Sequence, residues 1–259
     1  MFGLERKNQI INILEQEGKV DVNSLSEKFN ACKETIRRDL RELENEGIIK
    51  RTHGGAILNV PSDKILPEFP VGIREIHHAE EKKTICQKAA TLIRNGDTIF
   101  VDNSSTSLYL LRYIPKDLHV SILTNSLKLL LEAVQVQNPN LQFICLGGVF
   151  KESNMSLSGT IPQRIARDYY PSKAFLSCAS IHEQQMLTDS SPDEVDTKRL
   201  MIERSQKVIV LADYTKFSKM GQIYLADFGA IDQIITDNKI NPALVEFLKK
   251  YPLELVVCE

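Results

Sequence analysis

The sequence predicts two domains of different classes, a small N-terminal helical domain ending in a β-hairpin and a larger C-terminal α/β domain. Three observations predict them. Apolar residues recur at helical spacing up to Leu43, and a short hairpin follows. From residue 98 on, continuous apolar strands alternate with helical segments, which is typical of a mostly parallel sheet covered on both faces. Between them lie three prolines without periodicity. The predicted boundaries are 1–58, a linker at 59–70, and 71–259.

The N-terminal domain begins with two amphipathic helices. Leu4–Glu17 carries apolar residues on one helical face and is stopped by Gly18. Asn23 is an expected N-cap for a second, shorter helix that buries Leu25 and Phe29. A loop then leads to a third helix.

The third helix is expected in the segment 32–47. Ile36, Leu40 and Leu43 stand at i, i+4 and i+7, which places them on one apolar stripe, with arginines on the opposite side. The segment 48–58 reads as strand, Gly-Gly turn and strand, and it is basic. Three helices followed by a basic hairpin is the layout of a winged helix-turn-helix, which places its third helix in the major groove of DNA.

The residues best placed to meet bases or phosphates lie at the front of the third helix and on the hairpin, around a helix-turn-helix at about 20–39. They are Lys33, Glu34, Thr35, Arg37, Arg38, Arg41, Arg51 and His53. Residues 1–58 hold ten Lys and Arg and ten Asp and Glu, so the domain is neutral and only this local patch is basic. Salt bridges of Arg38 and Arg41 to Asp39, Glu42 or Glu44 remain the alternative.

The motifs of this domain resemble a known family. Phe29, the run Thr35–Leu40, Gly47 and the run His53–Ala56 are similar to the N-terminal motif of DeoR-type bacterial transcription regulators. One departure is Cys32, because the family usually has serine before the recognition helix. A thiol is a weak hydrogen-bond acceptor, so the helix is expected to start with a weaker cap.

The C-terminal domain is predicted as alternating strands and helices. An amphipathic segment at about 74–94 opens it. The expected strands are Thr98–Asp102, His119–Thr124, Leu141–Leu146, Lys173–Ala179, Lys207–Ala212, Ile231–Thr236 and Leu253–Cys258. Helices are expected through Leu111, over Leu127–Val136 and Pro192–Ser205, and between the last two strands.

Polar residues collect at the carboxyl ends of these strands, where parallel sheets bind ligands. Asp102 is followed by the hydroxyls of Ser104, Ser105 and Thr106 at a helix start, which suits a phosphate. Other strand ends carry Thr124, Asn125, Gly147, Gly148, Asp213 and Lys216. Capping, tight turns and local loop contacts are the alternative roles for each residue. Their shared position in the sheet nevertheless predicts one site.

The resemblance extends to this half. The run Leu211–Phe217 and the residues Asp102, Ser105 and Thr106 are similar to motifs of the DeoR sensor domain, although Ser104 replaces a glycine. The resemblance implies a Rossmann-like fold similar to ribose-5-phosphate isomerase and the glucosamine-6-phosphate deaminase group. A further family pattern of Thr, Glu and Lys falls on Thr188, Glu194 and Lys198, and it implies that Asp189 and Lys198 belong to the site.

We expect the hydroxyl loop and Lys216 to hold a phosphate, and Asp102 and Asp213 to accept hydrogen bonds from sugar hydroxyls. The leading interpretation is a cytoplasmic repressor of sugar metabolism genes. It would bind a double-stranded DNA operator under the control of a phosphorylated sugar, as a homo-oligomer (dimer or tetramer). One alternative is a sugar-phosphate isomerase or deaminase with an accessory DNA-binding domain. Another is an α/β half that only oligomerises.

Composition narrows these classes further. The chain has 259 residues, is 42% hydrophobic and 25% charged, and has no apolar run near twenty residues, so we expect no membrane segment. The first residues show no signal-peptide core or cleavage site, so we expect no signal peptide. The five cysteines are dispersed, which indicates reduced thiols rather than disulfides or a zinc site. No catalytic arrangement, metal or cofactor is expected.

Overall fold

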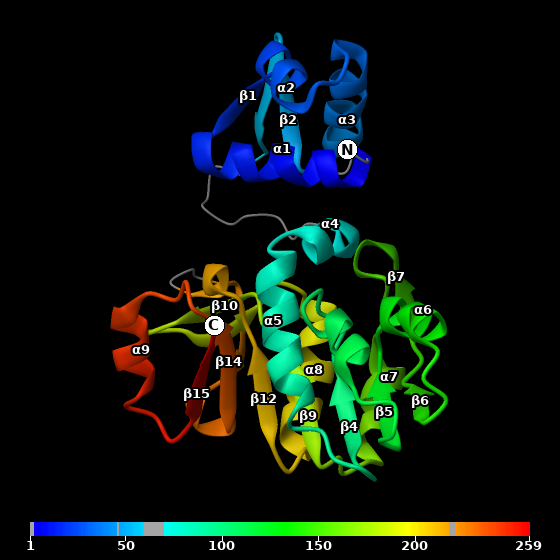
Figure 1. Cartoon of the computed structure of the whole chain (residues 1–259). Coiled ribbons are helices and arrows are strands. Elements are labelled where there is room, and N and C mark those ends of the chain that lie inside the picture. The colour runs from blue at the N-terminus through cyan, green and yellow to red at the C-terminus, as the bar shows by residue number, and fades with distance from the viewer. Residues whose placement is uncertain (1–2, 46, 60–69, 218–220) are drawn as a thin grey trace. The chain divides into compact units, whose positions relative to one another are not determined.

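The structure is a computed structural model of the whole chain, described here for residues 3–45, 47–59, 70–217 and 221–259. The chain folds as two compact units, Met1–His77 and His78–Glu259 (Figure 1). Most of the predicted linker, residues 60–69, lies outside the described residues. None of the helices in the described part of the chain is long and apolar enough to cross a membrane.

The first unit is a winged helix. Its elements in order are α1 (Gly3–Glu17), β1 (Lys19–Asp21), α2 (Val22–Phe29), α3 (Lys33–Asn45), β2 (Ile49–Thr52), β3 (Gly55–Leu58) and α4 (Val71–Ile76). The hairpin β2–β3 is the predicted one, and β1 adds a third antiparallel strand on the other side of β3. The apolar stripe of α3 is fully buried in the core of this unit, as predicted.

Two local details of this unit differ from the sequence prediction. The N-cap of α2 is Asp21 rather than Asn23, because the Asp21 carboxylate accepts hydrogen bonds from the amides of Asn23 (2.8 Å) and Ser24 (3.1 Å). The expected helix at 74–94 is two helices, α4 and α5 (Ala79–Ala90). His78 between them takes a left-handed φ of 54°, which interrupts helical hydrogen bonding.

A buried ion pair fixes α3 against α1. Arg6 Nε lies 2.5 Å from Asp39 Oδ2, and Arg6 Nη2 lies 3.1 Å from Oδ1, so the contact is bidentate. Asp39 is 2% exposed. This carboxylate is therefore a structural part of the Thr-Ile-Arg-Arg-Asp-Leu motif, and it turns inward while the arginines beside it remain at the surface.

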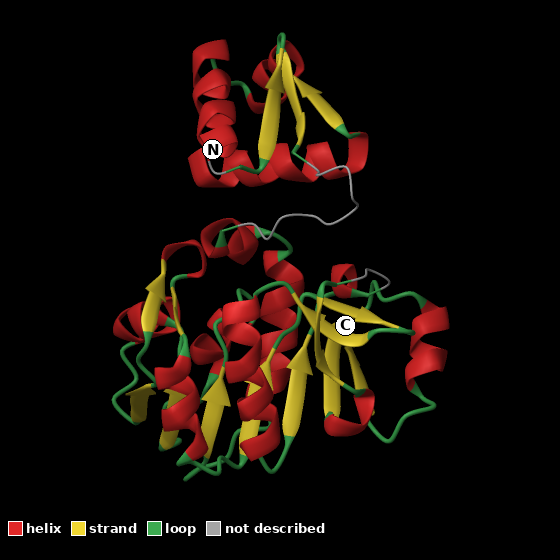
Figure 2. Cartoon of the chain, turned by 180° about the vertical axis from the view of Figure 1, so that it is seen from behind, coloured by secondary structure: helices red, strands yellow, loops and turns green. Residues whose placement is uncertain are grey.

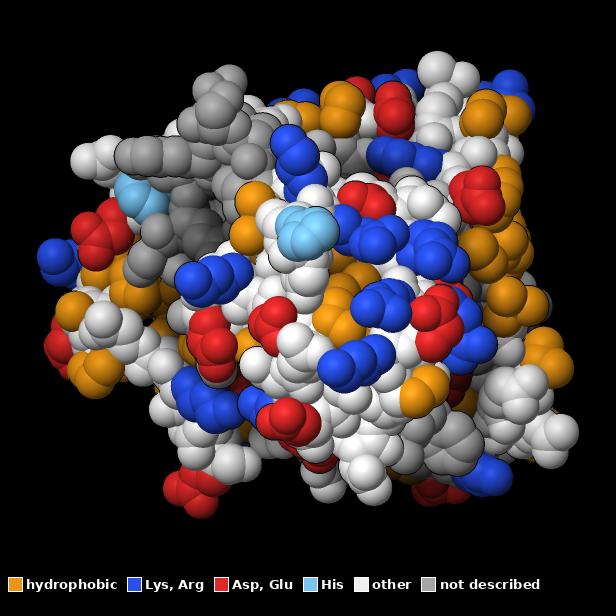
Figure 3. All heavy atoms as spheres, turned by 90° about the horizontal axis from the view of Figure 1, so that it is seen from above, with side chains coloured by type: hydrophobic (Ala, Val, Ile, Leu, Met, Phe, Trp, Pro, Cys, Tyr) orange, Lys and Arg blue, Asp and Glu red, His pale blue; other side chains and the backbone are white. Residues whose placement is uncertain are grey.

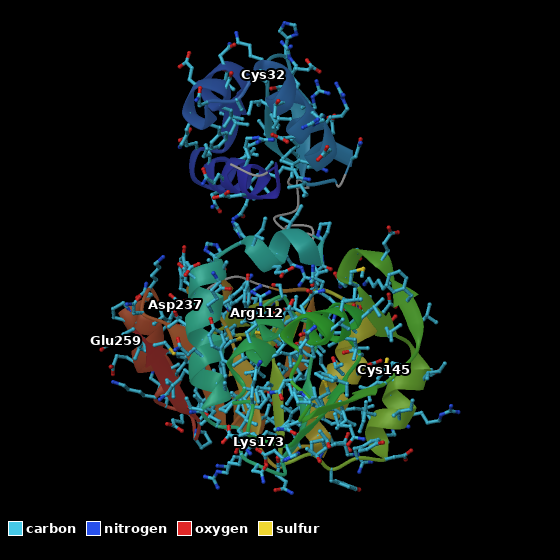
Figure 4. All side chains as sticks on the ribbon, turned by 45° about the vertical axis from the view of Figure 1, so that its right-hand side comes forward. Cys32, Arg112, Cys145, Lys173, Asp237 and Glu259 are labelled. Carbon is cyan, nitrogen blue, oxygen red and sulfur yellow. The ribbon has the colours of Figure 1, made fainter. Side chains whose placement is uncertain are left out.

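Cys32 precedes α3 and is exposed at the end of the first unit (Figure 4). Its Sγ lies 3.1 Å from Thr35 Oγ1, and hydrogen bonds from the Thr35 side chain and backbone lower the pKa of the thiol. The thiol thus occupies the capping position of the helix. We expect Cys32→Ser to strengthen the cap and to slow amide hydrogen exchange in the first turn of α3 by up to about fivefold. Faster exchange in the variant would contradict the capping role.

The second unit is built on one seven-stranded parallel sheet. Its strands are β4 (Thr98–Val101), β5 (Val120–Thr124), β6 (Leu141–Cys145), β9 (Lys173–Leu176), β12 (Val208–Leu211), β14 (Gln233–Asp237) and β15 (Glu254–Cys258). The order across the sheet is β15-β14-β12-β9-β4-β5-β6. All seven predicted strands are present and parallel, which confirms the predicted α/β class.

Helices cover both faces of the sheet (Figures 1 and 2). The first face carries α5, the 3-10 helix η1 (Ser107–Tyr113) and α6 (Leu127–Val136), and the second carries α7 (Thr160–Arg167) and α8 (Pro192–Arg204). A 3-10 helix η3 (Tyr214–Lys216) follows β12, and α9 (Pro242–Leu248) precedes β15. Core side chains such as Phe100, Phe175 and Ile234 are fully buried.

Several short antiparallel strands were not predicted. They are the hairpin of β7 (Val149–Lys151) and β8 (Ser156–Ser158), and the small sheet of β10 (Ser180–His182), β11 (Met186–Asp189) and β13 (Ile223–Ala226). Figure 4 labels Lys173 at the start of β9 and Asp237 at the end of β14, which mark the opposite ends of the parallel sheet. Lys173 forms an ion pair with Asp97 at 2.6 Å, at the amino ends of the strands.

Candidate functional site

The first candidate surface is formed by α3 and the wing. Lys33, Glu34, Arg37, Arg38, Arg41, Arg51 and His53 are exposed there, and Thr35 is half-buried. A hollow of about 210 Å³ separates α3 from the wing, with Arg37 on one side and Arg51 and His53 on the other. Figure 3 shows Lys and Arg side chains gathered on a face of this unit, with acidic side chains between them. The hollow and its cations suit a phosphate backbone.

Two acidic residues of α3 pair with basic residues of α1 rather than with the arginines of α3. Asp39 pairs with Arg6, and Glu42 pairs with Lys7 at 3.0 Å. Neither Arg38 nor Arg41 forms an ion pair with a described residue.

Two weaker pairs remain on this face. Glu44 accepts a hydrogen bond from the Arg51 amide (3.0 Å), with the Arg51 side chain 3.9 Å away. Arg37 has Glu34 at 3.5 Å in an exposed pair, which contributes little. The arginines of α3 therefore remain at the surface.

The second candidate site lies at the carboxyl ends of β4, β5, β9 and β12. Asp102, directly after β4, is fully buried and is the centre of a hydrogen-bond cluster. Its Oδ1 accepts from the Ser104 amide (3.1 Å) and the Ser107 hydroxyl (2.6 Å), and its Oδ2 accepts from the Ser177 amide (2.9 Å). Lys198 Nζ lies 3.3 Å from Oδ2.

The role of Asp102 therefore differs from the sugar contact that the sequence suggested. Both of its oxygens are occupied by groups of the protein itself, so it organises the loop instead of presenting a free acceptor to a sugar. Ser104 in place of the family glycine does not have a positive φ. Its hydroxyl accepts from the Ser107 amide at 3.1 Å, so the serine stabilises the turn locally.

Lys198 joins two carboxylates at this site. Its Nζ lies 2.7 Å from Asp189 Oδ2 and also donates to the Ser177 carbonyl at 3.0 Å. Burial alone would lower the pKa of Lys198, but the charges of Asp189 and Asp102 outweigh burial and raise it. The lysine is therefore charged, and it neutralises part of the buried negative charge.

Glu194 of α8 also belongs to this cluster. In the sequence, only the family pattern pointed to it. It is buried, and its carboxylate accepts hydrogen bonds from Asn154 Nδ2 (3.0 and 2.9 Å) and from the Ser156 hydroxyl. Burial acts to raise its pKa, but hydrogen bonds from Ser156 and Asn103 and the charge of Lys198 lower it overall. Glu194 thus stays ionised among donors from distant loops.

This lowered pKa makes the stability of the second unit sensitive to acid. The folded-state pKa of Glu194 lies below the unfolded value of about 4.3, so its contribution is present above that pH and is lost as the pH falls further. We expect Glu194→Gln to cost about 1–3 kcal/mol at pH 7 and little at pH 3, by urea unfolding at both pH values. The exposed Glu203→Gln is the control. An equal loss at both pH values would contradict the linkage.

Lys82 of α5 is a site residue that the sequence reasoning missed. It is 3% exposed, and its Nζ donates to the Ser105 hydroxyl at 3.1 Å. The only sequence signal is a lysine inside an amphipathic helix, where most lysines are solvated. The buried lysine therefore places a cation beside the predicted hydroxyl loop. The helix that follows this loop, η1, is a 3-10 helix of only seven residues, so its end provides little positive charge by itself.

Asp213 and Lys216 flank the same region after β12. Asp213 is buried, and its Oδ1 accepts from the Thr215 amide (3.0 Å) and hydroxyl. Burial would raise its pKa, but the charges of Lys216 and Lys82 outweigh burial and lower it. Lys82 and Lys216 lie on different elements, and the charges of both act on this carboxylate.

The remaining predicted residues follow β5 and β6. Thr124 Oγ1 accepts from the Ser126 amide (3.0 Å), a local capping role. Gly147 and Gly148 have positive φ, and a Cβ on Gly148 would lie 2.5 Å from the Ser158 carbonyl oxygen. Packing within the protein therefore accounts for glycine at this turn. Asn125, after β5, is buried.

A hollow in the second unit lies away from the strand-end cluster. It measures about 370 Å³ and is lined by residues of α5 and β15, including Thr84, Lys88 and Val257. It sits at the β15 edge of the sheet and contains few charged groups, whereas the strand-end cluster concentrates buried charge. The cluster is accordingly the stronger candidate for a ligand site.

Comparison with known proteins identifies both units. The family model of the DeoR-like helix-turn-helix domain matches residues 6–62, and that of the DeoR C-terminal sensor domain matches residues 77–238. The HTH-type transcriptional regulator GolR of Listeria innocua is 34% identical over 100% of both chains. The glycerol-3-phosphate regulon repressor of Escherichia coli is 28% identical, covering 98% of each chain. A ribose 5-phosphate isomerase from Methanocaldococcus jannaschii aligns with a TM-score of 0.41 at 16% identity, over 55% of this chain and 56% of that one.

Proposed function

We propose that this chain, which belongs to the DeoR family of helix-turn-helix transcriptional regulators, is a repressor of sugar metabolism genes whose operator affinity is controlled by a phosphorylated sugar. The observation that carries the proposal is a buried lysine, Lys82, hydrogen-bonded to the hydroxyl loop at the strand-end cluster. Lys82 donates to the Ser105 hydroxyl, and the charges of Lys216 and Lys82 lower the pKa of the buried Asp213. A phosphate needs such cations, because carboxylates alone would repel it.

The effector site in this proposal contains Asp102, Ser104, Ser105, Thr106, Thr124, Asn125, Gly147, Gly148, Asp189, Lys198, Asp213 and Lys216, with Lys82 added from the structure. Ser105, Thr106, Lys82 and Lys216 would bind the phosphate. Asp102, Asp189 and Asp213 would hold the loops and the lysines in place.

The carboxylates of the cluster favour a sensor over the isomerase or deaminase alternative. An enzyme of that class needs a carboxylate free to take a proton from the substrate, with a pKa near the working pH. Asp102 and Glu194 are buried and surrounded by donors of the protein. The pKa values of Glu194 and Asp213 are lowered, which leaves them weak bases.

Lys82 also suggests how occupancy of the site would affect DNA binding. It lies in the first turns of α5, which begins directly after the boundary between the two units at His77–His78. Glu81 in the same turns pairs with Lys239, and the ring of His78, the residue before α5, packs edge-on against Tyr214. A phosphate that draws Lys82 toward it would shift the segment leading to the winged helix.

DNA contact in this proposal is made by Lys33, Glu34, Thr35, Arg37, Arg38, Arg41, Arg51 and His53. We further propose that residues 71–259 mediate homo-oligomerisation, as a dimer or tetramer, because helix-turn-helix operators usually mirror a two-fold symmetry of the protein.

Lys216→Ala should weaken a phosphorylated sugar about tenfold to a hundredfold while changing the affinity for the plain sugar little, because only the phosphate loses a charged partner. Calorimetry with both compounds measures the two affinities. Operator binding without effector should stay unchanged. Equal losses for both sugars, or a loss of DNA binding, would contradict this assignment.

A thermal-shift screen of pentose and hexose phosphates, followed by assay for turnover, tests the proposed function. Binding without turnover is the expected result. Turnover would favour the enzyme, and the absence of any binding would favour an α/β unit that only oligomerises.

A further inference from the structure

Asn103 is a buried amide whose orientation is determined by its neighbour. It follows Asp102 at the end of β4 and is 3% exposed. Its side chain hydrogen-bonds to the Glu194 carboxylate, which is ionised and can only accept. The amide nitrogen must therefore face Glu194. The side-chain oxygen, Oδ1, is buried and has no hydrogen-bond partner in the described structure.

Asn125 repeats this arrangement after the neighbouring strand. It is 1% exposed, and its Nδ2 donates to the Leu157 carbonyl at 3.1 Å. A carbonyl is also only an acceptor, so the orientation of this amide is determined in the same way. The Oδ1 of Asn125 is likewise buried without a partner among the described residues.

The two asparagines lie in the loops that follow neighbouring strands of one sheet. β4 and β5 are parallel neighbours, with Phe100 opposite Leu123. Continuing this register places Asp102 opposite Asn125, with Asn103 one residue further along. Neighbouring strands lie about 4.8 Å apart. Two buried hydrogen-bond acceptors thus follow neighbouring strands, at the same end of the sheet as the loop that carries Ser105.

We infer that the Oδ1 atoms of Asn103 and Asn125 accept hydrogen bonds from two hydroxyl groups of the effector. The inference rests on the proposed function and narrows the effector to a phosphorylated polyol or sugar with at least two donating hydroxyls near each other. Carbonyl and ether oxygens cannot fill this role because they do not donate. A buried acceptor left unpaired is costly, so the site should reject an analogue that lacks one of these hydroxyls.

The test uses calorimetry on the full chain with ribose 5-phosphate, fructose 6-phosphate, glucose 6-phosphate, glycerol 3-phosphate and inorganic phosphate. The compound that binds most tightly is then compared with its monodeoxy analogues. At least one analogue should bind about tenfold to a hundredfold more weakly. Inorganic phosphate should bind Asn103→Ala, Asn125→Ala and the wild-type protein alike.

The variants show which side chain each hydroxyl meets. In Asn103→Ala or Asn125→Ala, the penalty for removing the matching hydroxyl should disappear, since the acceptor is already absent. Asn154→Ala is the matched control. It also removes a buried amide that donates to Glu194, but Asn154 has no unpaired buried atom. It should keep the full penalty.

The outcomes separate this inference from the proposed function. If no sugar phosphate binds the wild-type protein, both fail. If sugar phosphates bind but no monodeoxy analogue loses as much as tenfold, only this inference is overturned. That comparison needs the wild-type protein alone, so it holds even where an alanine variant does not fold. Penalties that persist unchanged in both asparagine variants would also overturn it.

Discussion

Replacing Arg37 and Arg38 together with alanine should weaken operator binding by about 2–6 kcal/mol, because each arginine that meets a base contributes about 1–3 kcal/mol. Both side chains are exposed on α3. Asp39 and Glu42 pair with Arg6 and Lys7 instead, and the one pair of Arg37, with Glu34, is itself exposed. If either arginine contacts a phosphate instead, its replacement should make the plot of log affinity against log salt concentration less steep, by about one unit of slope.

The matched control for this variant is Arg164→Ala with Arg167→Ala. These two arginines are also exposed on one helix, α7, but they lie in the second unit. The control changes the net charge equally and should leave operator binding nearly unchanged at moderate salt. Unchanged affinity in the α3 variant, with its circular dichroism spectrum intact, would remove the recognition-helix assignment.

Lys198→Met should destabilise the second unit by about 3–5 kcal/mol, because it leaves Asp102 and Asp189 buried without their cation. Methionine retains most of the side-chain volume, so the loss reports the missing charge rather than a cavity. The chain has no tryptophan, so calorimetry or far-UV circular dichroism is the suitable measurement.

Lys173→Met is the control for the ion-pair argument. Lys173 pairs with Asp97 at 2.6 Å, but both side chains are about a tenth exposed and lie at the amino ends of the strands. Only one carboxylate loses its cation there, and Asp97 keeps hydrogen bonds from the Arg94 amide and the Ser172 hydroxyl, so the expected cost is smaller, about 1–3 kcal/mol. Equal costs for the two variants would show that the strand-end network has no special electrostatic role.

The parallel sheet could be predicted from sequence because its strands are continuous apolar runs. The residues 208–211, for example, are four buried apolar side chains in succession. The short antiparallel strands could not be predicted in this way. β10 and β8 have three residues each, too few to show a period, and their pairing depends on the fold around them.

The candidate site was predictable only in outline. Parallel topology brings strand ends together, so the positions of Asp102, Asn125 and Asp213 follow from the strand pattern. The partners of those residues do not. Glu194 receives its hydrogen bonds from a loop 40 residues earlier in the chain, and Lys82 reaches Ser105 across 23 residues. Such contacts depend on tertiary packing, which residue spacing does not encode.

For Asp102, the sequence predicted the position correctly but not the role. A carboxylate after a strand indicates a ligand contact when only the sequence is considered. In the fold, four donors from three segments surround it, because Ser177 after β9 and Lys198 on α8 meet the loop that follows β4. Buried polar groups are usually satisfied by the protein first, which makes the unpaired oxygens of Asn103 and Asn125 more informative about a ligand.

The most direct test of effector control is a titration of the protein–operator complex with sugar phosphates. The operator is selected from a random-sequence DNA pool, and each sugar phosphate is compared with its plain sugar. Allosteric coupling of 1–3 kcal/mol predicts that one sugar phosphate changes operator affinity about 5- to 150-fold, while its plain sugar has little effect. A sugar phosphate that binds the protein tightly yet leaves operator affinity unchanged would contradict the account.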